Sequence, residues 1–209
     1  MDFEILETLA LKDGRWQSWP LHWARLQIAA QHFGYPLHQA ALEAQMQALQ
    51  QQKAAGDWRV RLALDAQGQV QMAAEPLQPS ATPVRLELAQ QPIANSVAQS
   101  DWVRFKTSRR AHYNAFRPRG AHVFDVVLHN DNGEITEGTR GNVCMQLDGR
   151  WVTPPLACGL LPGVGRALAL SQGRVSERVV RIDEVPQIEG WAFVNSLRGW
   201  LEAQLISAH

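Results

Sequence analysis

The sequence predicts an α+β protein in which strand hairpins are mixed irregularly with isolated helices. Three observations support this class. Segments with alternating apolar residues are short, segments with helical periodicity are few, and the chain shows neither an internal repeat nor a regular strand–helix–strand series. With 209 residues, 45% of them hydrophobic, the chain can bury a sizeable core in one domain or in two small ones.

Residues 1–76 are expected to form an N-terminal α+β domain. Apolar alternation predicts a strand at its start, and the following Lys-Asp-Gly triplet predicts a turn. Apolar residues at helical spacing, after Pro20 and before Gly34 in the first case, predict two helices. The expected elements are a strand over 4–11, helices over 20–34 and 38–53, and a hairpin of strands 58–65 and 70–75. Prolines and a lack of periodicity mark residues 77–82 as a linker.

Residues 83–209 are expected to form a second domain that is richer in strands. Its predicted strands cover 84–93, 123–129, 142–147, 151–152, 175–182, 191–195 and 200–206, with short helices over 109–116 and 164–171. The stretch Glu134–Val143, EITEGTRGNV, is interpreted as a short strand pair between two turns. Its glutamates, glycines and asparagine are costly in a sheet interior, because buried polar groups need partners and glycine weakens a strand. The stretch therefore predicts a site that requires polar atoms on a rigid backbone.

Composition narrows the classes of function. Twenty basic residues balance twenty acidic ones, which argues against nucleic acid as the main partner. The apolar runs are too short to span a membrane and no leader opens the chain, so a soluble, cytoplasmic protein is expected. Two cysteines give neither a disulfide framework nor metal-binding spacing, and the seven histidines are scattered, so no metal site is predicted.

Lysine is scarce, which limits the candidates for amine chemistry. The three lysines are Lys12, Lys53 and Lys106. Lys12 lies in a turn and Lys53 at a helix end, where a cation suits the helix dipole. Lys106 follows the alternating segment 102–105 in RFKTSRRAHY. From these residues alone, a solvated basic face is the simpler interpretation, and a patch for an anionic partner is the alternative.

Two further features could hold an anion. Gly159 and Gly163 precede the predicted helix at 164 and Gly165 lies in its first turn, so backbone N–H groups at its start could face a phosphate. The segment lacks the Gly-Lys-Ser/Thr ending of a P-loop, and a plain helix start explains it equally well. Arg25, on the first helix, is either an arginine whose charge reaches solvent along its stem or a bidentate phosphate clamp.

Several short motifs follow one another along nearly the whole chain. They are Glu7-Thr8-Leu9 with Asp13-Gly14, His22-x-x-Arg25-Leu26, Lys106, Thr136-Glu137-Gly138-x-x-x-Asn142, Asp148-Gly149, Thr153-Pro154-Pro155 and Leu161-Pro162-Gly163-x-x-Arg166. With these motifs in this order, the chain resembles the class IV (fold type IV) pyridoxal-phosphate enzymes. The resemblance implies a two-domain fold like that of D-amino-acid aminotransferase, with a small N-terminal α/β sandwich and a larger barrel-like domain.

The resemblance also implies a cofactor, pyridoxal 5'-phosphate, and a role for each matched residue. Lys106 matches the lysine that bonds covalently to the cofactor's aldehyde carbon and moves a substrate proton. Glu137 matches the carboxylate that pairs with the pyridine nitrogen. Asn142 matches the motif asparagine that supports the site. The positions that match the phosphate-binding ones are Arg25, Val164, Gly165, Asn195 and Ser196.

Looser matches concern the cofactor's ring hydroxyl and the substrate carboxylates. They are Tyr113, the cluster Arg104, Arg109 and Arg110, and Arg198. The substrate implied is a small amine or amino acid, and a homodimer is expected by resemblance.

Three departures favour one branch of the family. The chain begins at the Glu7-Thr8-Leu9 strand, Gly165 replaces the usual threonine of the phosphate site, and residues 193–200 resemble the asparagine-containing segment of the lyases. Together they imply 4-amino-4-deoxychorismate lyase, which forms 4-aminobenzoate, a folate precursor, and pyruvate. A class IV aminotransferase acting on branched-chain, D- or aromatic amino acids is the first alternative. A cofactor-free, non-catalytic homologue is the second.

Overall fold

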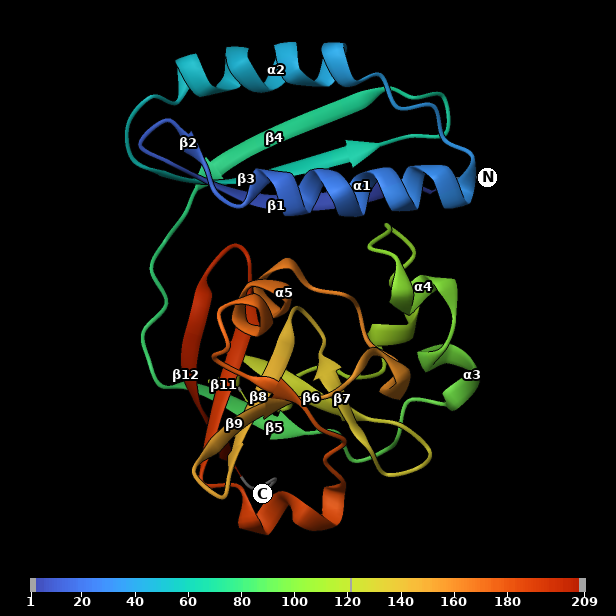
Figure 1. The fold of residues 1–209 in the computed structure, drawn as a ribbon, viewed down its shortest axis with the longest axis vertical. Helices are drawn as coiled ribbons and strands as arrows, with labels where there is room; N and C mark the ends of the chain where they lie inside the picture. The colour runs from blue at the N-terminus through green and yellow to red at the C-terminus, as the bar shows by residue number, and fades with distance from the viewer. Residues whose placement is uncertain (1–2, 121, 207–209) are drawn as a thin grey trace. The chain divides into compact units, whose positions relative to one another are not determined.

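The structure is a computed structural model that describes residues 3–120 and 122–206. The described chain divides into two compact units (Figure 1). The first unit runs to Pro79 and also includes Phe105–Arg109, and the second comprises Ser80–Arg104 and the chain from Arg110 onward. Within the described ranges, no helix combines the length and apolarity needed to cross a membrane.

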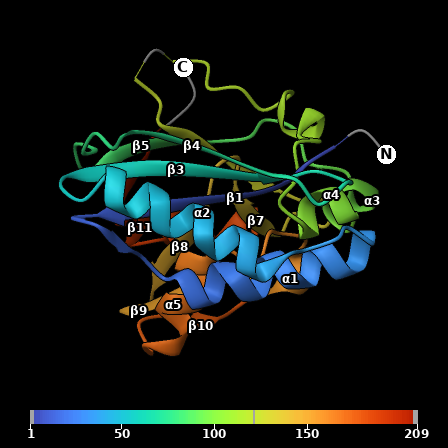
Figure 2. The same cartoon turned by 90° about the horizontal axis from the view of Figure 1, so that it is seen from above.

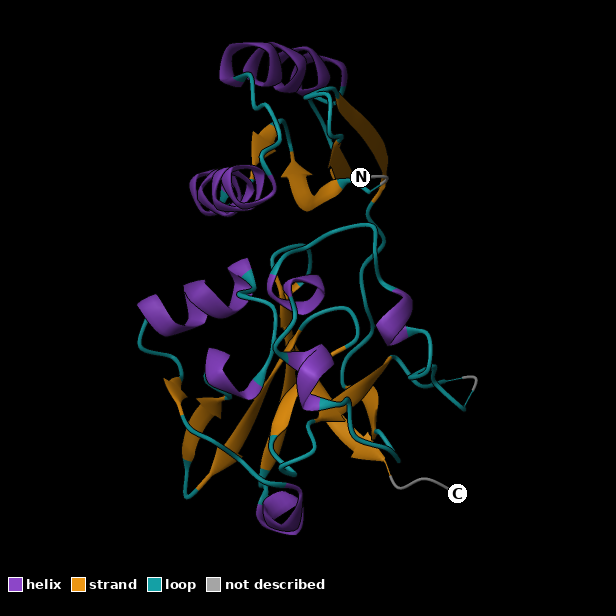
Figure 3. Cartoon of the chain, turned by 90° about the vertical axis from the view of Figure 1, so that its right-hand side faces the viewer, coloured by secondary structure: helices purple, strands orange, loops and turns teal. Residues whose placement is uncertain are grey.

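The first unit is a four-stranded antiparallel sheet with two helices on one face (Figures 2 and 3). The strand order is β2-β1-β3-β4, from β1 (Ile5–Lys12), β2 (Arg15–Trp16), β3 (Asp57–Leu64) and β4 (Val70–Pro76). Helix α1 (Trp19–Phe33) has a proline in its first turn and ends at Gly34, whose φ of 69° suits glycine. Helix α2 (Gln39–Gln52) buries Leu42 and Met46. The predicted hairpin and both helices are present, within one residue or so of their expected bounds.

The segment Phe105–Arg109 joins the first unit through β1. The amide of Leu6 donates to the carbonyl of Lys106 at 2.8 Å, and Ser108 donates its amide to the carbonyl of Glu4 at 2.9 Å. The short helix α4 (Asp101–Arg104) precedes this segment, so most of the alternating residues noted over 102–105 are helical. A window of four residues satisfies either periodicity, and here the helical one is adopted.

The second unit is built on one eight-stranded sheet with the order β10-β9-β8-β11-β12-β5-β6-β7. Its strands are β5 (Val84–Leu88), β6 (Asp125–His129), β7 (Ile135–Gly138), β8 (Asn142–Leu147), β9 (Arg150–Thr153), β10 (Ser176–Glu177), β11 (Gly190–Asn195) and β12 (Gly199–Ile206). The sheet curls into a half-barrel around a core that includes Val127, Ile135, Val143 and Phe193. Its described helices are α3 (Asn95–Ala98), α4, α5 (Val164–Ser171) and three short 3-10 turns over Ala111–Tyr113, Leu156–Cys158 and Ile182–Gln187. The predicted α+β fold of this family type is confirmed.

Three predicted elements of this unit need correction. The strand expected over 84–93 ends at Leu88, and the helix expected over 109–116 is only the 3-10 turn Ala111–Tyr113. The strand expected over 175–182 is reduced to Ser176–Glu177. After Glu177, residues 178–182 make separate backbone hydrogen bonds, such as those between Ile135 and Val180 and between Ile182 and Gly133, and these do not form a continuous ladder.

The strand pair expected over 134–143 is also not a pair. Strand β7 pairs with β6, whereas β8 pairs with β9 and β11. The curl of the sheet brings β7 and β8 near each other without a ladder, and one hydrogen bond of 2.7 Å from Gly138 to the carbonyl of Gly141 closes the connection between them.

Candidate functional site

Glu137 is a buried carboxylate whose two oxygens are both hydrogen-bonded. Glu137 is 3% exposed and belongs to strand β7, whose four residues are all buried. Tyr113 donates its hydroxyl to Oε1 at 2.5 Å, and the amide of Leu161 donates to Oε2 at 3.0 Å. Burial and the neighbouring carboxylate raise the pKa of Tyr113 well above its usual value, so the phenol stays a donor. The Glu137 carboxylate is therefore matched by internal partners, whereas the buried Thr136 hydroxyl on the same strand has no hydrogen-bond partner among the described residues.

Asn142 holds the backbone of the same residue, Leu161, at its carbonyl. Its Nδ2 donates to the carbonyl of Leu161 at 3.0 Å, while Glu137 accepts from the Leu161 amide. A Cβ on Gly163 would lie 1.9 Å from the Asn142 Oδ1, so a side chain there would displace the Asn142 amide that binds Leu161. The segment leading to α5 is therefore fixed by the first residues of β8 and the last residues of β7.

The start of α5 lies against the end of β11. A Cβ added to Gly165 would lie 2.6 Å from the carbonyl carbon of Asn195, which belongs to the backbone and cannot swing away. Glycine is thus required by close approach, and the absence of threonine here has a steric cause. The first amides of α5, at Val164 and Gly165, have no acceptor within the helix and favour an anion. Ser196 follows Asn195 in the same turn.

Arg25 is held in the first unit by a buried acid. Glu7, 1% exposed in β1, accepts from the Arg25 Nε at 2.8 Å, from a terminal guanidinium nitrogen at 2.6 Å and from His22 Nδ1 at 2.6 Å. Burial alone would raise the pKa of Glu7, but Arg25 and His22 outweigh it and lower the pKa to about 2. The arginine therefore has a fixed orientation, which a purely solvated side chain would lack.

Lys106 belongs to the same unit as Arg25, and its backbone lies beside strand β1. Its carbonyl accepts from Leu6, the residue that precedes Glu7 in β1. Strand β1 therefore organises both basic residues that the sequence assigns to the site. The other six assigned residues, Glu137, Asn142, Val164, Gly165, Asn195 and Ser196, are in the second unit.

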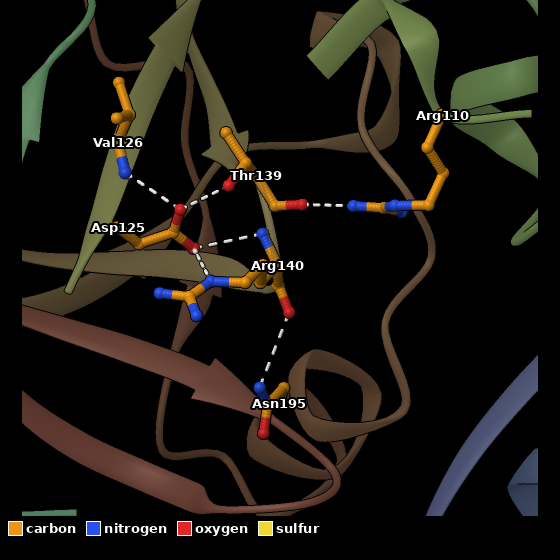
Figure 4. Close-up of polar contacts among 6 residues, drawn as sticks. All are labelled: Arg110, Asp125, Val126, Thr139, Arg140 and Asn195. Carbon is orange, nitrogen blue, oxygen red and sulfur yellow. Dashed lines mark hydrogen bonds and ion pairs between the residues drawn. The ribbon is translucent and has the colours of Figure 1, made fainter. Parts of the chain in front are cut away.

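One residue of this region was not predicted from sequence. Asp125, at the start of β6, is fully buried and binds the connection Thr139–Gly141 between β7 and β8 (Figure 4). Arg110 donates to the carbonyl of Thr139 from another side. The signal was present in the sequence, because a lone acid in the apolar run Phe124–Leu128 needs buried partners.

Thiol chemistry has no support in this structure. Cys144 and Cys158 are both buried, and burial raises their pKa values to about 12 and about 11. A thiol is nucleophilic mainly as the thiolate, so neither is a nucleophile near neutral pH. Within residues 3–120 and 122–206, no group of three or more His, Cys, Asp and Glu side chains could hold a metal ion.

The second unit offers the donor set that a phosphorylated pyridine ring requires. A buried carboxylate suits a protonated ring nitrogen, and a helix start bordered by a glycine that has no room for a side chain suits a phosphate. Leu161, which contacts Glu137, and Val164 at the start of α5 are three residues apart, at most about 11 Å along the chain. The residues present therefore fit pyridoxal phosphate.

A curled eight-stranded sheet with such a site defines a fold type IV pyridoxal-phosphate enzyme. The family model described as amino-transferase class IV matches residues 4–206, and the chain belongs to this family of pyridoxal-phosphate-dependent enzymes. The predicted family membership is thereby confirmed.

Its relatives carry two kinds of name. A Schizosaccharomyces pombe protein provisionally named as an aminodeoxychorismate lyase is 31% identical over 179 residues, covering 83% of this chain and 75% of its own. A Mesorhizobium loti structure provisionally named as an amino-acid aminotransferase is 36% identical, covers 98% of this chain and 100% of its own, and has a TM-score of 0.88. A Legionella pneumophila structure provisionally named as a 4-amino-4-deoxychorismate lyase has a TM-score of 0.83 at 19% identity, over 97% of this chain and 82% of its own, and shows the shared fold.

Proposed function

We propose that the protein is a pyridoxal-phosphate-dependent 4-amino-4-deoxychorismate lyase, which releases pyruvate and forms 4-aminobenzoate. The observation that carries the proposal is the buried Glu137 carboxylate, held on both oxygens and joined through Leu161 to the start of α5. The lyase branch is supported by the Schizosaccharomyces pombe relative and by Gly165, whose contact with Asn195 leaves no room for the threonine of typical aminotransferases.

Glu137 is assigned to the pyridine nitrogen. A carboxylate with two fixed donors cannot rotate, so it presents the same lone pairs to any bound ring. Its negative charge raises the proton affinity of a ring nitrogen beside it. When bound, the protonated cofactor ring accepts electrons from the substrate carbon that loses a proton.

The phosphate is assigned to the amides of Val164 and Gly165, to Ser196 and to Arg25. The amides carry the partial positive charge of the α5 N-terminus. Arg25 contributes a full charge, and its bidentate pair with Glu7 holds the guanidinium plane in one orientation. Asn142 acts indirectly, because its amide fixes the segment that carries these groups.

Lys106 is assigned two roles. Its amine would hold the cofactor covalently, which leaves the cofactor's aldehyde carbon open to exchange with the substrate's amine. The neutral amine then accepts the proton from the ring carbon that bears the amino group. The electron pair of that C–H bond forms the aromatic ring as the C–O bond to the enolpyruvyl group breaks, and the departing enolate takes up a proton at carbon to become pyruvate.

Covalent binding of the cofactor is tested on the purified protein. With pyridoxal phosphate added, we expect the visible absorbance of a lysine-bound cofactor. Borohydride reduction and peptide mapping should then locate the label on Lys106, and the Lys106→Arg variant should stay unlabelled. A colourless wild-type protein would contradict the proposal and favour a cofactor-free homologue.

A class IV aminotransferase is the second candidate, favoured by the 36% identity to the Mesorhizobium loti protein over its whole length. Two assays separate the candidates. A lyase releases pyruvate and 4-aminobenzoate in equal amounts from aminodeoxychorismate without a second substrate. An aminotransferase instead exchanges the amino group between an amino acid and a 2-oxo acid, and releases no pyruvate from aminodeoxychorismate.

Assembly and location remain predictions. A homodimer is supported by apolar side chains on the outside of α1, where Leu21 is 37% and Ile28 is 61% exposed. We propose a cytoplasmic location, which agrees with the proposed folate-related reaction. We also propose that the partner is a small amine substrate and not a nucleic acid. Sedimentation of the purified protein at several concentrations tests the dimer.

A further inference from the structure

Asp125 is a buried acid whose partners outside its own strand lie on one short connection. It is 0% exposed, in a strand whose five residues are all buried. Its Oδ1 accepts from the Thr139 hydroxyl at 2.5 Å and from the Val126 amide at 2.8 Å. Its Oδ2 accepts from the Arg140 amide at 3.0 Å and lies 3.8 Å from the Arg140 Nε (Figure 4). Because a buried carboxylate needs several donors, these contacts tie β6 to residues 139 and 140.

The connection Thr139–Gly141 has little freedom to adopt another position. A Cβ on Gly141 would lie 2.5 Å from the Phe193 ring and 2.8 Å from the carbonyl oxygen of Val194, so its backbone is packed directly on β11. Gly138 donates to the carbonyl of Gly141 at 2.7 Å, which closes the turn. Glu137 stands two residues before Thr139, so a shift of this connection displaces the carboxylate proposed to bind the ring nitrogen.

The same connection reaches the turn beside α5. The Arg140 carbonyl accepts from the Asn195 Nδ2 at 3.4 Å, and the Asn195 Oδ1 accepts from the Arg198 amide at 2.9 Å. Both ends of the Asn195 amide are therefore used inside the protein. The Asn195 backbone in turn lies against Gly165 at the start of α5. The contacts run from Asp125 through Arg140 and Asn195 to the proposed phosphate site.

We propose that Asp125 is a positioning residue of the cofactor site. It fixes the connection Thr139–Gly141 and thereby sets the places of the Glu137 carboxylate and of the turn that begins at Asn195. This inference rests on the proposed function for its ligand. The positioning itself rests on contacts within the second unit alone.

The experiment uses Asp125→Asn and a matched control. Asparagine keeps the shape of the side chain, but its amide nitrogen cannot accept from the Arg140 amide, and the charge that attracts the guanidinium is lost. The control is Glu87→Gln, since Glu87 is also a buried acid of the same unit, 4% exposed, and its hydrogen bond is to the Arg119 amide instead. Both variants remove one buried charge, so a general loss of stability affects both.

For Asp125→Asn we expect a pyridoxal-phosphate dissociation constant raised by about tenfold or more, as for small displacements of binding groups. Glu87→Gln should keep the wild-type constant. Thr139→Ser should bind like wild type because it keeps the hydroxyl that donates to Asp125, and Thr139→Val should bind more weakly. Equal dissociation constants for wild type, Asp125→Asn and Glu87→Gln would overturn the inference.

Amide hydrogen exchange of the apoprotein provides a readout without cofactor. Positioning by Asp125 predicts faster exchange at residues 137–142 and 195–198 in Asp125→Asn, with wild-type rates there in Glu87→Gln. Unchanged exchange in those segments would contradict the inference even if binding weakens. A wild-type protein that binds no cofactor would contradict the proposed function and with it the ligand named here, and the exchange data would then decide the structural part alone.

Discussion

The hydroxyl of Tyr113 donates to Glu137 Oε1 at 2.5 Å, and this hydrogen bond joins a 3-10 turn to strand β7. Both residues are buried, at 9% and 3% exposure. The raised pKa of Tyr113 means that the donor keeps its proton beyond pH 10, the usual value for tyrosine. The pair holds the acid in one rotamer across the working pH range.

Tyr113→Phe tests this pair. Removing the hydroxyl leaves a buried carboxylate oxygen with one donor fewer, so we expect the free energy of unfolding to fall by about 1–3 kcal/mol. Binding of pyridoxal phosphate should weaken as Glu137 gains freedom. Urea unfolding of the apoprotein and a cofactor titration measure the two effects, and Tyr35→Phe is the control, since the Tyr35 hydroxyl donates to the Phe3 carbonyl in the first unit. A Tyr113→Phe variant that binds the cofactor as tightly as wild type would contradict this role.

Glu7 should contribute to the free energy of unfolding at neutral pH, and this contribution should be lost in acid. Its pKa falls from 4.5 to about 2 on folding, so its contribution is complete above pH 4.5 and is lost as the pH decreases towards 2. The expected size is about 3 kcal/mol at neutral pH. Glu7→Gln should lower the free energy of unfolding at pH 7 and reduce its change between pH 5 and about 2.

The matched control for Glu7 is Glu4→Gln. Glu4 pairs with Arg61, and both side chains are more than a third exposed, so the loss should be at most about 1 kcal/mol. Urea unfolding at a series of pH values measures both variants. An identical pH dependence for Glu7→Gln and wild type would show that the buried cluster contributes no net stability.

Gly165→Thr would restore the residue usual in the aminotransferases, yet we expect it to harm the protein. The new Cβ meets the Asn195 backbone at 2.6 Å, and such overpacking costs about 1–3 kcal/mol. The control is Ala167→Thr, on the exposed side of the same helix, with an expected loss below about 1 kcal/mol from helix propensity. Thermal unfolding compares the two, and an equal or higher melting temperature for Gly165→Thr than for wild type would contradict the steric explanation.

The two cysteines should resist labelling in the native state. Burial raises their pKa values to about 12 and about 11, so at pH 8 the thiolate is rare and shielded. We expect no reaction of a thiol reagent with native protein in the time that labels both thiols in guanidinium chloride. Fast labelling of Cys144 or Cys158 in the native protein would show that the half-barrel opens locally.

Local elements could be predicted well from the sequence. Helix α5 has the predicted bounds because Gly163 precedes it and its apolar spacing is helical, and strands β11 and β12 begin within a residue of their expected starts. What could not be predicted is the partner of each strand. Strands β7 and β8 are separated by three residues, as in a hairpin, yet the curl of the sheet gives them different partners.

Contacts between side chains that are far apart in the sequence also could not be predicted. Arg25 and Glu7 are 18 residues apart, and no local pattern indicates that the acid faces the arginine. Asp125 was overlooked for the same reason, since its partners follow a turn 14 residues away. The assigned site residues were found by motif, whereas the residues that hold them become visible only from the fold.

The backbone of Leu161 donates its N–H to Glu137 and accepts at its C=O from Asn142, so the two peptide units on either side of this residue are both held. From that anchored residue, the stretch to α5 works as a spacer of constant length between a carboxylate and a helix end. Inserting one residue there would alter the span of molecule that both groups can hold at once. The length of this short backbone segment thus limits which ligands can reach both the carboxylate and the start of the helix.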